Sequence, residues 1–210
     1  MKHIDNKELN VIFQVLKDIM NENRDYLIKL DSAIGDGDLG ITMSKGFDKA
    51  AEISSNLEEK DLGKYLIKIG MGIAEAVPST MGTLVATGFM NAGKELKGNE
   101  VLCTKKVAIL FEAFVNGIMN RSKAKPGEKT VIDSLYKASE ALKNSIELPL
   151  KEAIKIALVE AEKGLEATKQ MKSTYGKAAI YQEKSIGKLD PGATVGKLIV
   201  EGFYKAIVTE

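Results

Sequence analysis

The sequence predicts an all-α protein, because helical periodicity covers most of its 210 residues and strand patterns are weak. Its prolines fall between the periodic segments, where a missing amide hydrogen costs least: Pro78, Pro126, Pro149 and Pro191. The apolar run Val107–Phe111 could begin a strand, but it continues with helical spacing through Phe114 and Ile118. We therefore expect one all-α domain over residues 1–210.

The first expected helix spans about 5–27, where apolar residues recur every three or four positions: Leu9, Ile12, Phe13, Leu16, Ile19 and Met20. Seven further helices are expected near 41–54, 60–76, 80–97, 102–122, 130–146, 149–173 and 191–208. Only 174–190 is long and without a clear helical pattern. Long irregular loops inside compact domains are usually functional.

Composition excludes several classes of protein. Lys and Arg total 30 against 29 Asp and Glu, so no global charge attracts nucleic acid or a membrane surface. No apolar run approaches a membrane span, and the single Cys103 excludes an internal disulfide, so we expect a soluble, cytoplasmic protein. The only histidine, His3, argues against a Ser-His triad, a Cys-His pair and a histidine-based zinc site.

The segment LDSAIGDGDLGITMSKGF places Asp31, Asp36 and Asp38 within eight residues, with Gly35 and Gly37 between them. Crowded carboxylates repel one another unless a cation or shared protons neutralise them. Hard cations such as Mg²⁺ prefer oxygen ligands and often bridge carboxylates to phosphates. The segment therefore predicts a metal–phosphate site. Its alternative interpretation is a turn that only caps the next helix.

Three other polar, glycine-bearing loops separate the expected helices. VPSTMGT (77–83) offers hydroxyls and amides that suit phosphate, although Ser79 or Thr80 could equally be a simple N-cap. In KPGEKTVID (125–133), Thr130 can cap the next helix. In SIGKLDPGAT (185–194), Asp190 can likewise cap the next helix, Pro191 takes the first helical position and Gly192 follows.

The positions of these loops along the chain predict where they lie. Alternate loops of an antiparallel helix array lie at the same end. The aspartate segment and the three other polar loops are the first, third, fifth and seventh connections. We therefore expect all four at one end, with the plain connections near 55–59, 98–101 and 147–149 opposite.

At these same loops the chain resembles the nucleotide-binding L subunit of dihydroxyacetone kinase and the matching domain of the single-chain ATP-dependent kinases. The resemblance covers essentially the full length. It rests on three motifs in the expected order: LDSAIGDGDLGITMSKGF, AKPGEKTVIDSL and YGKAAIYQEKSIGKLDPGAT. It implies an eight-helix antiparallel barrel of amphipathic helices that holds Mg²⁺ and nucleotide at one end.

By this resemblance, Asp31, Asp36 and Asp38 would be the catalytic residues and would coordinate two Mg²⁺ ions on the phosphates of ADP or ATP. The phosphoryl group would pass to dihydroxyacetone held on a separate K subunit. In the version fed by the phosphotransferase system, an M subunit carrying phosphohistidine would rephosphorylate bound ADP. The sequence has no K-like domain, so it resembles the detached L subunit, and it leaves a homodimer open.

The resemblance and the loop chemistry together assign nucleotide contacts to Leu39, Gly40, Thr42, Ser79, Thr80, Met81, Gly82, Ser122, Val131, Lys184, Asp190, Pro191 and Gly192. Several of these depart from the family pattern. Leu39 and Thr42 replace a histidine and an asparagine, and Met81 replaces a phosphate-binding serine. Lys184 replaces an arginine and loses its bidentate fork. Beside the base, Ser122 replaces glycine and Val131 replaces methionine.

These departures leave two alternative functions open. One is a divergent paralogue that binds metal or nucleotide for regulation and does not catalyse, which Leu39 and Met81 favour. The other is a kinase subunit for a different small hydroxylated or carbonyl substrate, because substrate choice would lie on the K-like partner.

Overall fold

The computed structural model of the protein describes residues 3–208, and in this range it is built from nine α-helices and two 3₁₀ helices. Its elements are α1 (Asn6–Glu22), α2 (Arg24–Ser32), α3 (Leu39–Ser55), α4 (Leu62–Ala76), α5 (Thr80–Glu95), α6 (Thr104–Ser122), α7 (Val131–Lys143), α8 (Leu150–Ala167), η1 (Thr168–Gln170), η2 (Lys177–Ser185) and α9 (Pro191–Val208). The only strand-like pairing within it is an isolated bridge between Ile4 and Leu102. The all-α prediction is confirmed.

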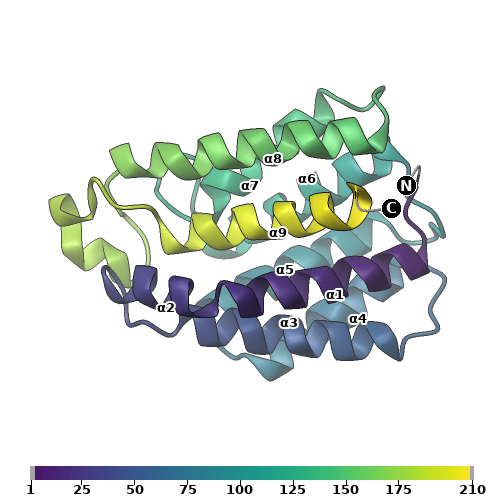
Figure 1. Ribbon diagram of the computed structural model, residues 1–210, viewed down its shortest axis with the longest axis horizontal. Helices are drawn as coiled ribbons and strands as arrows, with labels where there is room; N and C mark the ends of the chain where they lie inside the picture. The colour runs from purple at the N-terminus through teal and green to yellow at the C-terminus, as the bar shows by residue number, and fades with distance from the viewer. Residues whose placement is uncertain (1–2, 209–210) are drawn as a thin grey trace.

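The long helices form a closed antiparallel ring. From α3 to α9 each helix packs against the next, α1 packs against α3, and α9 returns to pack against α1 (Figure 1). From α3 to α9 consecutive helices run in opposite directions along the long axis of the molecule, and α2 continues in the direction of α1 (Figure 1). The eight-helix antiparallel barrel implied by the resemblance is therefore confirmed, with α1 and α2 together making up its first helix. None of the helices in residues 3–208 is long and apolar enough to cross a membrane.

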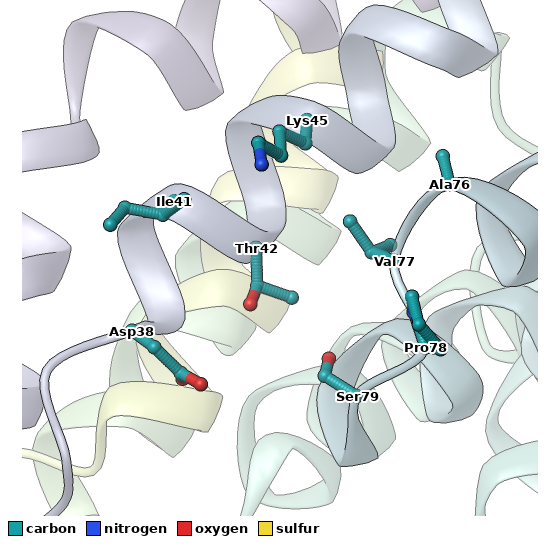
Figure 2. Close-up of a pocket in the computed structure, with 8 residues that line it drawn as sticks. All are labelled: Asp38, Ile41, Thr42, Lys45, Ala76, Val77, Pro78 and Ser79. Carbon is teal, nitrogen blue, oxygen red and sulfur yellow. The ribbon is translucent and has the colours of Figure 1, made fainter.

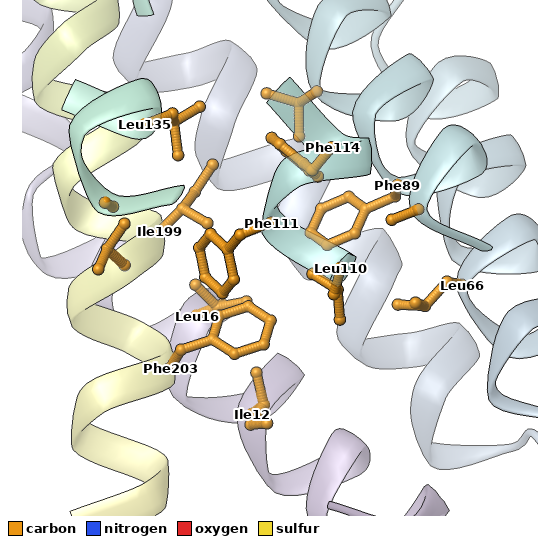
Figure 3. Close-up of a cluster of buried hydrophobic side chains, with 14 of the residues drawn as sticks. Ile12, Leu16, Leu66, Phe89, Leu110, Phe111, Phe114, Leu135, Ile199 and Phe203 are labelled. Carbon is orange, nitrogen blue, oxygen red and sulfur yellow. The ribbon is translucent and has the colours of Figure 1, made fainter. Parts of the chain in front are cut away.

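Aromatic rings fill the centre of this ring of helices (Figure 3). Phe89 of α5 lies 4.8 Å from Phe114 of α6 and 5.4 Å from Phe13 of α1, measured between ring centroids. Phe111 of α6 lies 5.0 Å from Phe203 of α9. Because these contacts join helices from both halves of the chain, the core stabilises the closed ring as one unit.

The first helix differs from the prediction. The single helix expected over 5–27 is wrong, because Asn23 separates α1 from α2, and α2 then continues to Ser32. The Asn23 side-chain amide donates to the Ile19 carbonyl at 2.9 Å, and its backbone has φ −95° and ψ 7°. An asparagine side chain that bonds to a carbonyl of the preceding turn competes with regular helical bonding.

The end of α8 and the segment that follows it also differ from the prediction. The helix expected over 149–173 ends at Ala167, where the Thr168 hydroxyl donates to the Leu165 carbonyl at 2.6 Å. The segment expected to be irregular, 174–190, contains η2, which is interrupted at Gln182 by a left-handed φ of 48°. The remaining helix ends agree with the prediction to within three residues.

The connections separate as the alternation predicts. The loops before α3, α5, α7 and α9 lie at one end of the barrel, and the loops before α4, α6 and α8 lie at the other (Figure 1). Each loop at the first end leads into the N-terminus of a long helix. The partial positive charge of a helix N-terminus favours anions, so four such charges gather at the end that carries the aspartates.

Candidate metal and nucleotide site

The three aspartates converge in residues 31–38, the end of α2 and the turn that leads into α3, which we call the aspartate loop. Asp31, Asp36 and Asp38 each offer one carboxylate oxygen, and these oxygens all lie within 4.8 Å of one another. Asp31 is half-buried, and the other two side chains are exposed. Residues spread over eight positions of sequence thus present one compact set of hard oxygen donors.

Backbone geometry holds this loop in shape. Gly37 has a left-handed φ of 76°, and its N–H donates to Asp31 Oδ2 at 2.9 Å. The N–H of Leu39 reaches the same oxygen at 3.4 Å. At Gly35 a side chain would clash with the Asp31 carboxylate. The glycines are therefore required by the tight bend around Asp31.

The Asp38 carboxylate is not used to cap a helix. Asp38 is the N-cap residue of α3, yet its side chain makes no capping hydrogen bond. The interpretation of this segment as a simple helix cap therefore does not account for Asp38. A carboxylate in this position remains available to a cation.

The oxygen set fits Mg²⁺. Magnesium binds oxygen at about 2.1 Å, so two ligands of one ion lie at most about 4.2 Å apart. The spacing of the aspartate oxygens, up to 4.8 Å, needs only small side-chain rotations to meet that limit. All the donors are carboxylates, which suit a hard cation and not a soft one. Asp31, Asp36 and Asp38 are thus the residues that could hold the metal.

Two lysines from the segment between α8 and α9 reach the aspartate loop. Lys177 forms an ion pair with Asp36. Lys188 donates from its ammonium to the Ala33 carbonyl at 3.0 Å. Neither lysine is among the site residues expected from the sequence. These contacts bring positive charge to the point where phosphate would meet the carboxylates.

A pocket of about 240 Å³ lies beside the aspartates, between the start of α3 and the 77–79 loop. The hydroxyls of Thr42 and Ser79 and the carboxylate of Asp38 face the same space (Figure 2). Lys45 lines the pocket one turn further along α3. Its spacing from Asp38 and Thr42 puts all three on one helical face, which is the signal that could have identified Lys45 from the sequence.

Met81 occupies a second meeting point, where α5, α7 and α9 begin. A side chain added at Gly192 would lie 3.0 Å from the Met81 methyl carbon and 3.1 Å from the Val131 backbone nitrogen. The same position is 3.0 Å from the Asp190 carboxylate. The structure therefore brings together Met81, Val131, Asp190 and Gly192, although their loops are far apart in sequence.

Side-chain caps fix the starts of α7 and α9, as expected. Thr130 accepts from the Ile132 N–H at 3.2 Å, and Asp190 accepts from the Ala193 N–H at 2.6 Å. Burial, with a smaller contribution from the nearby Asp133 carboxylate, raises the pKa of Asp190 to about 7. Asp133 accepts from the Gly127 and Thr130 amides, and burial raises its pKa as well. Asp133 and Asp190 therefore fix the backbone at the starts of α7 and α9.

Other residues assigned to the nucleotide have structural roles here. Leu39 is buried in the hydrophobic core, and Gly40 lies so close to the Arg24 carbonyl that a side chain would clash. Gly82 is equally close to the Val77 carbonyl. The Ser122 hydroxyl donates to the Ile118 carbonyl at 2.8 Å.

Three assigned positions have no such role. Thr80 is exposed at the start of α5, and Pro191 is buried at the start of α9. Lys184 is exposed and makes no hydrogen bond or ion pair within residues 3–208. Lys177, seven residues earlier, is instead the lysine of this segment that contacts the aspartate loop.

Comparison with known proteins agrees with this geometry. A family model described as the DAK2 domain matches residues 33–205. The ADP-binding subunit DhaL of the PEP-dependent dihydroxyacetone kinase of Escherichia coli K12 is 34% identical over 84% of this chain and 85% of its own length. The corresponding subunit of dihydroxyacetone kinase 1 of Listeria innocua is 35% identical over 91% of this chain and 90% of its own.

Solved structures agree on the fold. The dihydroxyacetone kinase of C. freundii, crystallised in complex with AMP-PNP and Mg²⁺, superposes with a TM-score of 0.71 at 22% identity. The match covers 93% of this chain and 33% of the other, so the chain spans about a third of that kinase.

Proposed function

Because the chain belongs to the DAK2 domain family, we propose that it is an Mg²⁺-dependent nucleotide-binding subunit of a phosphotransferase. It transfers a phosphoryl group to dihydroxyacetone held on a separate K subunit. Residues 1–210 make up one domain of this family. The observation that carries the proposal is the convergence of Asp31, Asp36 and Asp38 at the end of the barrel where four helices begin.

Different side chains would bind the metal ion and the phosphate groups. Asp31, Asp36 and Asp38 hold Mg²⁺, which neutralises phosphate charge and aligns the transferred group when bound. Thr42 and Ser79 donate hydroxyl hydrogen bonds to phosphate oxygens from the walls of the adjoining pocket. Lys45 and Lys177 add positive charge on two sides of it. Phosphoryl transfer needs this positioning more than covalent chemistry.

The nucleotide would also contact the point where α5, α7 and α9 begin. Met81, Val131 and Gly192 meet there, and Gly192 leaves room that a side chain would fill. Asp190 and Pro191 form the turn that closes this end, while Thr80, Gly82 and the amides near Leu39 and Gly40 complete the phosphate-facing surface. Ser122 and Lys184 lie at the rim.

Partners and location follow from the same proposal. The relatives named above are ADP-binding subunits of PEP-dependent kinases. We infer that ADP would stay bound here and be recharged by an M subunit carrying phosphohistidine, and that Asp31, Asp36 and Asp38 would hold two Mg²⁺ ions that neutralise phosphate charge. A homodimer and a cytoplasmic location remain predictions, and we expect neither nucleic acid nor membrane as a partner.

The direct test is calorimetry of ADP binding with and without Mg²⁺. Asp36→Ala should abolish Mg²⁺-dependent ADP binding, because it removes one of three metal ligands. Asp18→Asn is the matched control, since Asp18 is an exposed acid on α1 that pairs with Lys17 at 3.4 Å. Unchanged binding in Asp36→Ala would refute the assignment.

One observation favours a second function. Leu39 stands where the family has histidine, and it is buried in the core and cannot reach a nucleotide. A regulatory paralogue that binds ADP and does not transfer phosphate would tolerate this change. Phosphorylation of dihydroxyacetone in the presence of K and M subunits would exclude that function. Turnover with another small ketose alone would instead identify a kinase subunit of different specificity.

A further inference from the structure

Lys129 is a buried cation that the proposed site does not use. Its side chain is only 2% exposed, and its backbone has a left-handed φ of 58°. It forms no ion pair within residues 3–208. A buried ammonium without a carboxylate in contact is costly unless dipoles surround it, and a left-handed non-glycine residue is a further cost. Both costs suggest that Lys129 has a specific role.

The Lys129 ammonium is surrounded by backbone carbonyls of the segment between α8 and α9. It donates to the carbonyl oxygens of Ser185 and Lys188, each at 2.7 Å, of Thr168 at 2.8 Å and of Met171 at 3.1 Å. Two of these acceptors precede residues 172–184 and two follow them. One side chain from the α6–α7 loop therefore joins both ends of this excursion of the chain.

Two further hydrogen bonds link the two ends of this excursion. The Ser173 N–H donates to the Ser185 hydroxyl at 2.9 Å, and the Gly187 N–H donates to the Lys169 carbonyl at 2.7 Å. These bonds join the chain segment that enters the excursion to the segment that leaves it. Within residues 3–208, Lys129 joins both ends of the excursion to the α6–α7 loop through four acceptors, and the hydroxyls of Thr174 and Tyr175 add single bonds to the Glu128 and Lys123 carbonyls.

The far end of the excursion reaches the aspartate loop. Lys177 is ion-paired with Asp36, and both side chains are exposed at 63% and 41%. An exposed pair of this kind contributes little to stability. The reach of Lys177 toward the metal ligands is therefore set by how the rest of the excursion is held, that is, by the four Lys129 bonds together with those of Thr174 and Tyr175.

We propose that Lys129 is a positioning residue that holds the 168–190 segment over the nucleotide site by binding four of its carbonyls. The lysine touches neither metal nor phosphate. It acts through the segment, whose tip it keeps at the aspartate loop. The part of this inference that concerns nucleotide affinity rests on the proposed function, whereas the part that concerns the segment's order does not.

Hydrogen exchange followed by mass spectrometry tests the inference on the full chain without nucleotide. Lys129→Met keeps the length of the side chain and removes the charge and the donors. Amides of residues 172–187 should exchange about tenfold faster or more, while amides in the core helices α5 and α6 keep their protection. Lys172→Met is the matched control, because Lys172 lies in the same segment and pairs with Glu183 at the surface at 2.9 Å.

Lys129→Gln is the second variant if Lys129→Met does not fold, because its amide can still donate to two of the four carbonyls. It should give a smaller acceleration in the same peptides. Unchanged exchange in 172–187, or a uniform acceleration across the whole chain, overturns the inference for either variant.

Calorimetry with Mg²⁺ and ADP then gives the second measurement. We expect affinity about tenfold lower in Lys129→Met and unchanged in Lys172→Met. If the unaltered protein binds no ADP, the proposed function fails while the exchange data still decide the role of Lys129. If the variant loses its segment protection and keeps full ADP affinity, the positioning role is refuted.

Discussion

The Lys177 ammonium is ion-paired with the Asp36 carboxylate, so residues 141 positions apart in the chain meet at the candidate metal site. The contact gives Asp36 a positive partner from the protein itself. A divalent cation that binds Asp36 must compete with this ammonium or displace it. The 168–190 segment and the metal ligands are thereby linked through one side chain.

Lys177→Ala should strengthen metal binding in the absence of nucleotide. Removing an exposed cation relieves a competition worth a fraction of a kcal/mol up to about 1 kcal/mol, so the affinity for Mn²⁺ should rise about two- to fivefold. Titration followed by the paramagnetic signal of Mn²⁺ measures this. Lys172→Ala, which breaks a surface pair with Glu183 in the same segment, should have no effect. Equal or weaker metal binding in Lys177→Ala would contradict the competition.

Gly37→Ala should weaken metal binding in addition to lowering the stability of the fold. The left-handed φ of 76° costs alanine about 1 kcal/mol, and the added carbon would also clash with the Ser32 hydroxyl. Gly98→Ala is the matched control, since Gly98 has φ 80° in the loop before α6 with no atom within 4 Å of the added carbon. Gly37→Ala should lose more stability than Gly98→Ala in urea unfolding because of the added clash, and only Gly37→Ala should lose Mn²⁺ affinity. Equal metal affinities would separate the glycine from the site.

Met81→Ser should strengthen ADP binding in the presence of Mg²⁺. The change returns a hydroxyl donor to the start of α5 and removes the methyl group that lies beside Gly192. One net hydrogen bond is worth about 0.5–1.5 kcal/mol, so the affinity should rise about two- to tenfold. Met71→Ser provides the comparison, because Met71 is 59% exposed on α4. Calorimetry that finds weaker binding in Met81→Ser would mean that the methionine itself packs against the nucleotide.

Asp190 should make the protein less stable as the pH rises. Burial raises its pKa from 3.8 to about 7, so between these values the folded state keeps a proton that the unfolded state has released. Stability from this group is complete below about pH 4 and is lost as the pH rises through 7, by at most about 1.4 kcal/mol per pH unit.

Asp190→Asn removes this titration and keeps an oxygen that can accept from the Ala193 amide. Urea unfolding at pH 5, 6, 7 and 8 should therefore show a flatter dependence in the variant than in the parent protein. Asp18→Asn, on the surface of α1, should follow the parent. A slope in Asp190→Asn equal to that of the parent would show that Asp190 titrates normally.

Periodicity was sufficient to predict an all-α domain and which loops share an end, whereas the eight-helix barrel was implied by the family resemblance. Apolar spacing identified each long helix because each buries one face, and alternation then placed the loops. Asn23 was missed because a side-chain bond to the Ile19 carbonyl interrupts a helix without changing its apolar pattern. The end of α8 was missed because the bonds that stop it involve Lys129, which belongs to another loop.

The site was predictable only in its local parts. The aspartates stand within one short segment, so composition and glycine spacing were enough to single them out. The choice of Lys177 over Lys184 depends on the path of the 168–190 segment across the aspartate loop. That path is fixed by contacts 39 to 59 residues distant in sequence, which no local pattern contains. The inward packing of Leu39 likewise depends on helices that follow it in the chain.

The position of the chain ends has a practical consequence. Both ends of the described chain lie at the end of the barrel away from the aspartate loop (Figure 1). A fluorescent protein or affinity tag fused there therefore leaves the binding face open. A domain fused there that must reach the aspartates has to pass alongside α9, whose 18 residues extend about 27 Å. A flexible linker for such a fusion should therefore contain at least about 20 to 25 residues to make that span without strain.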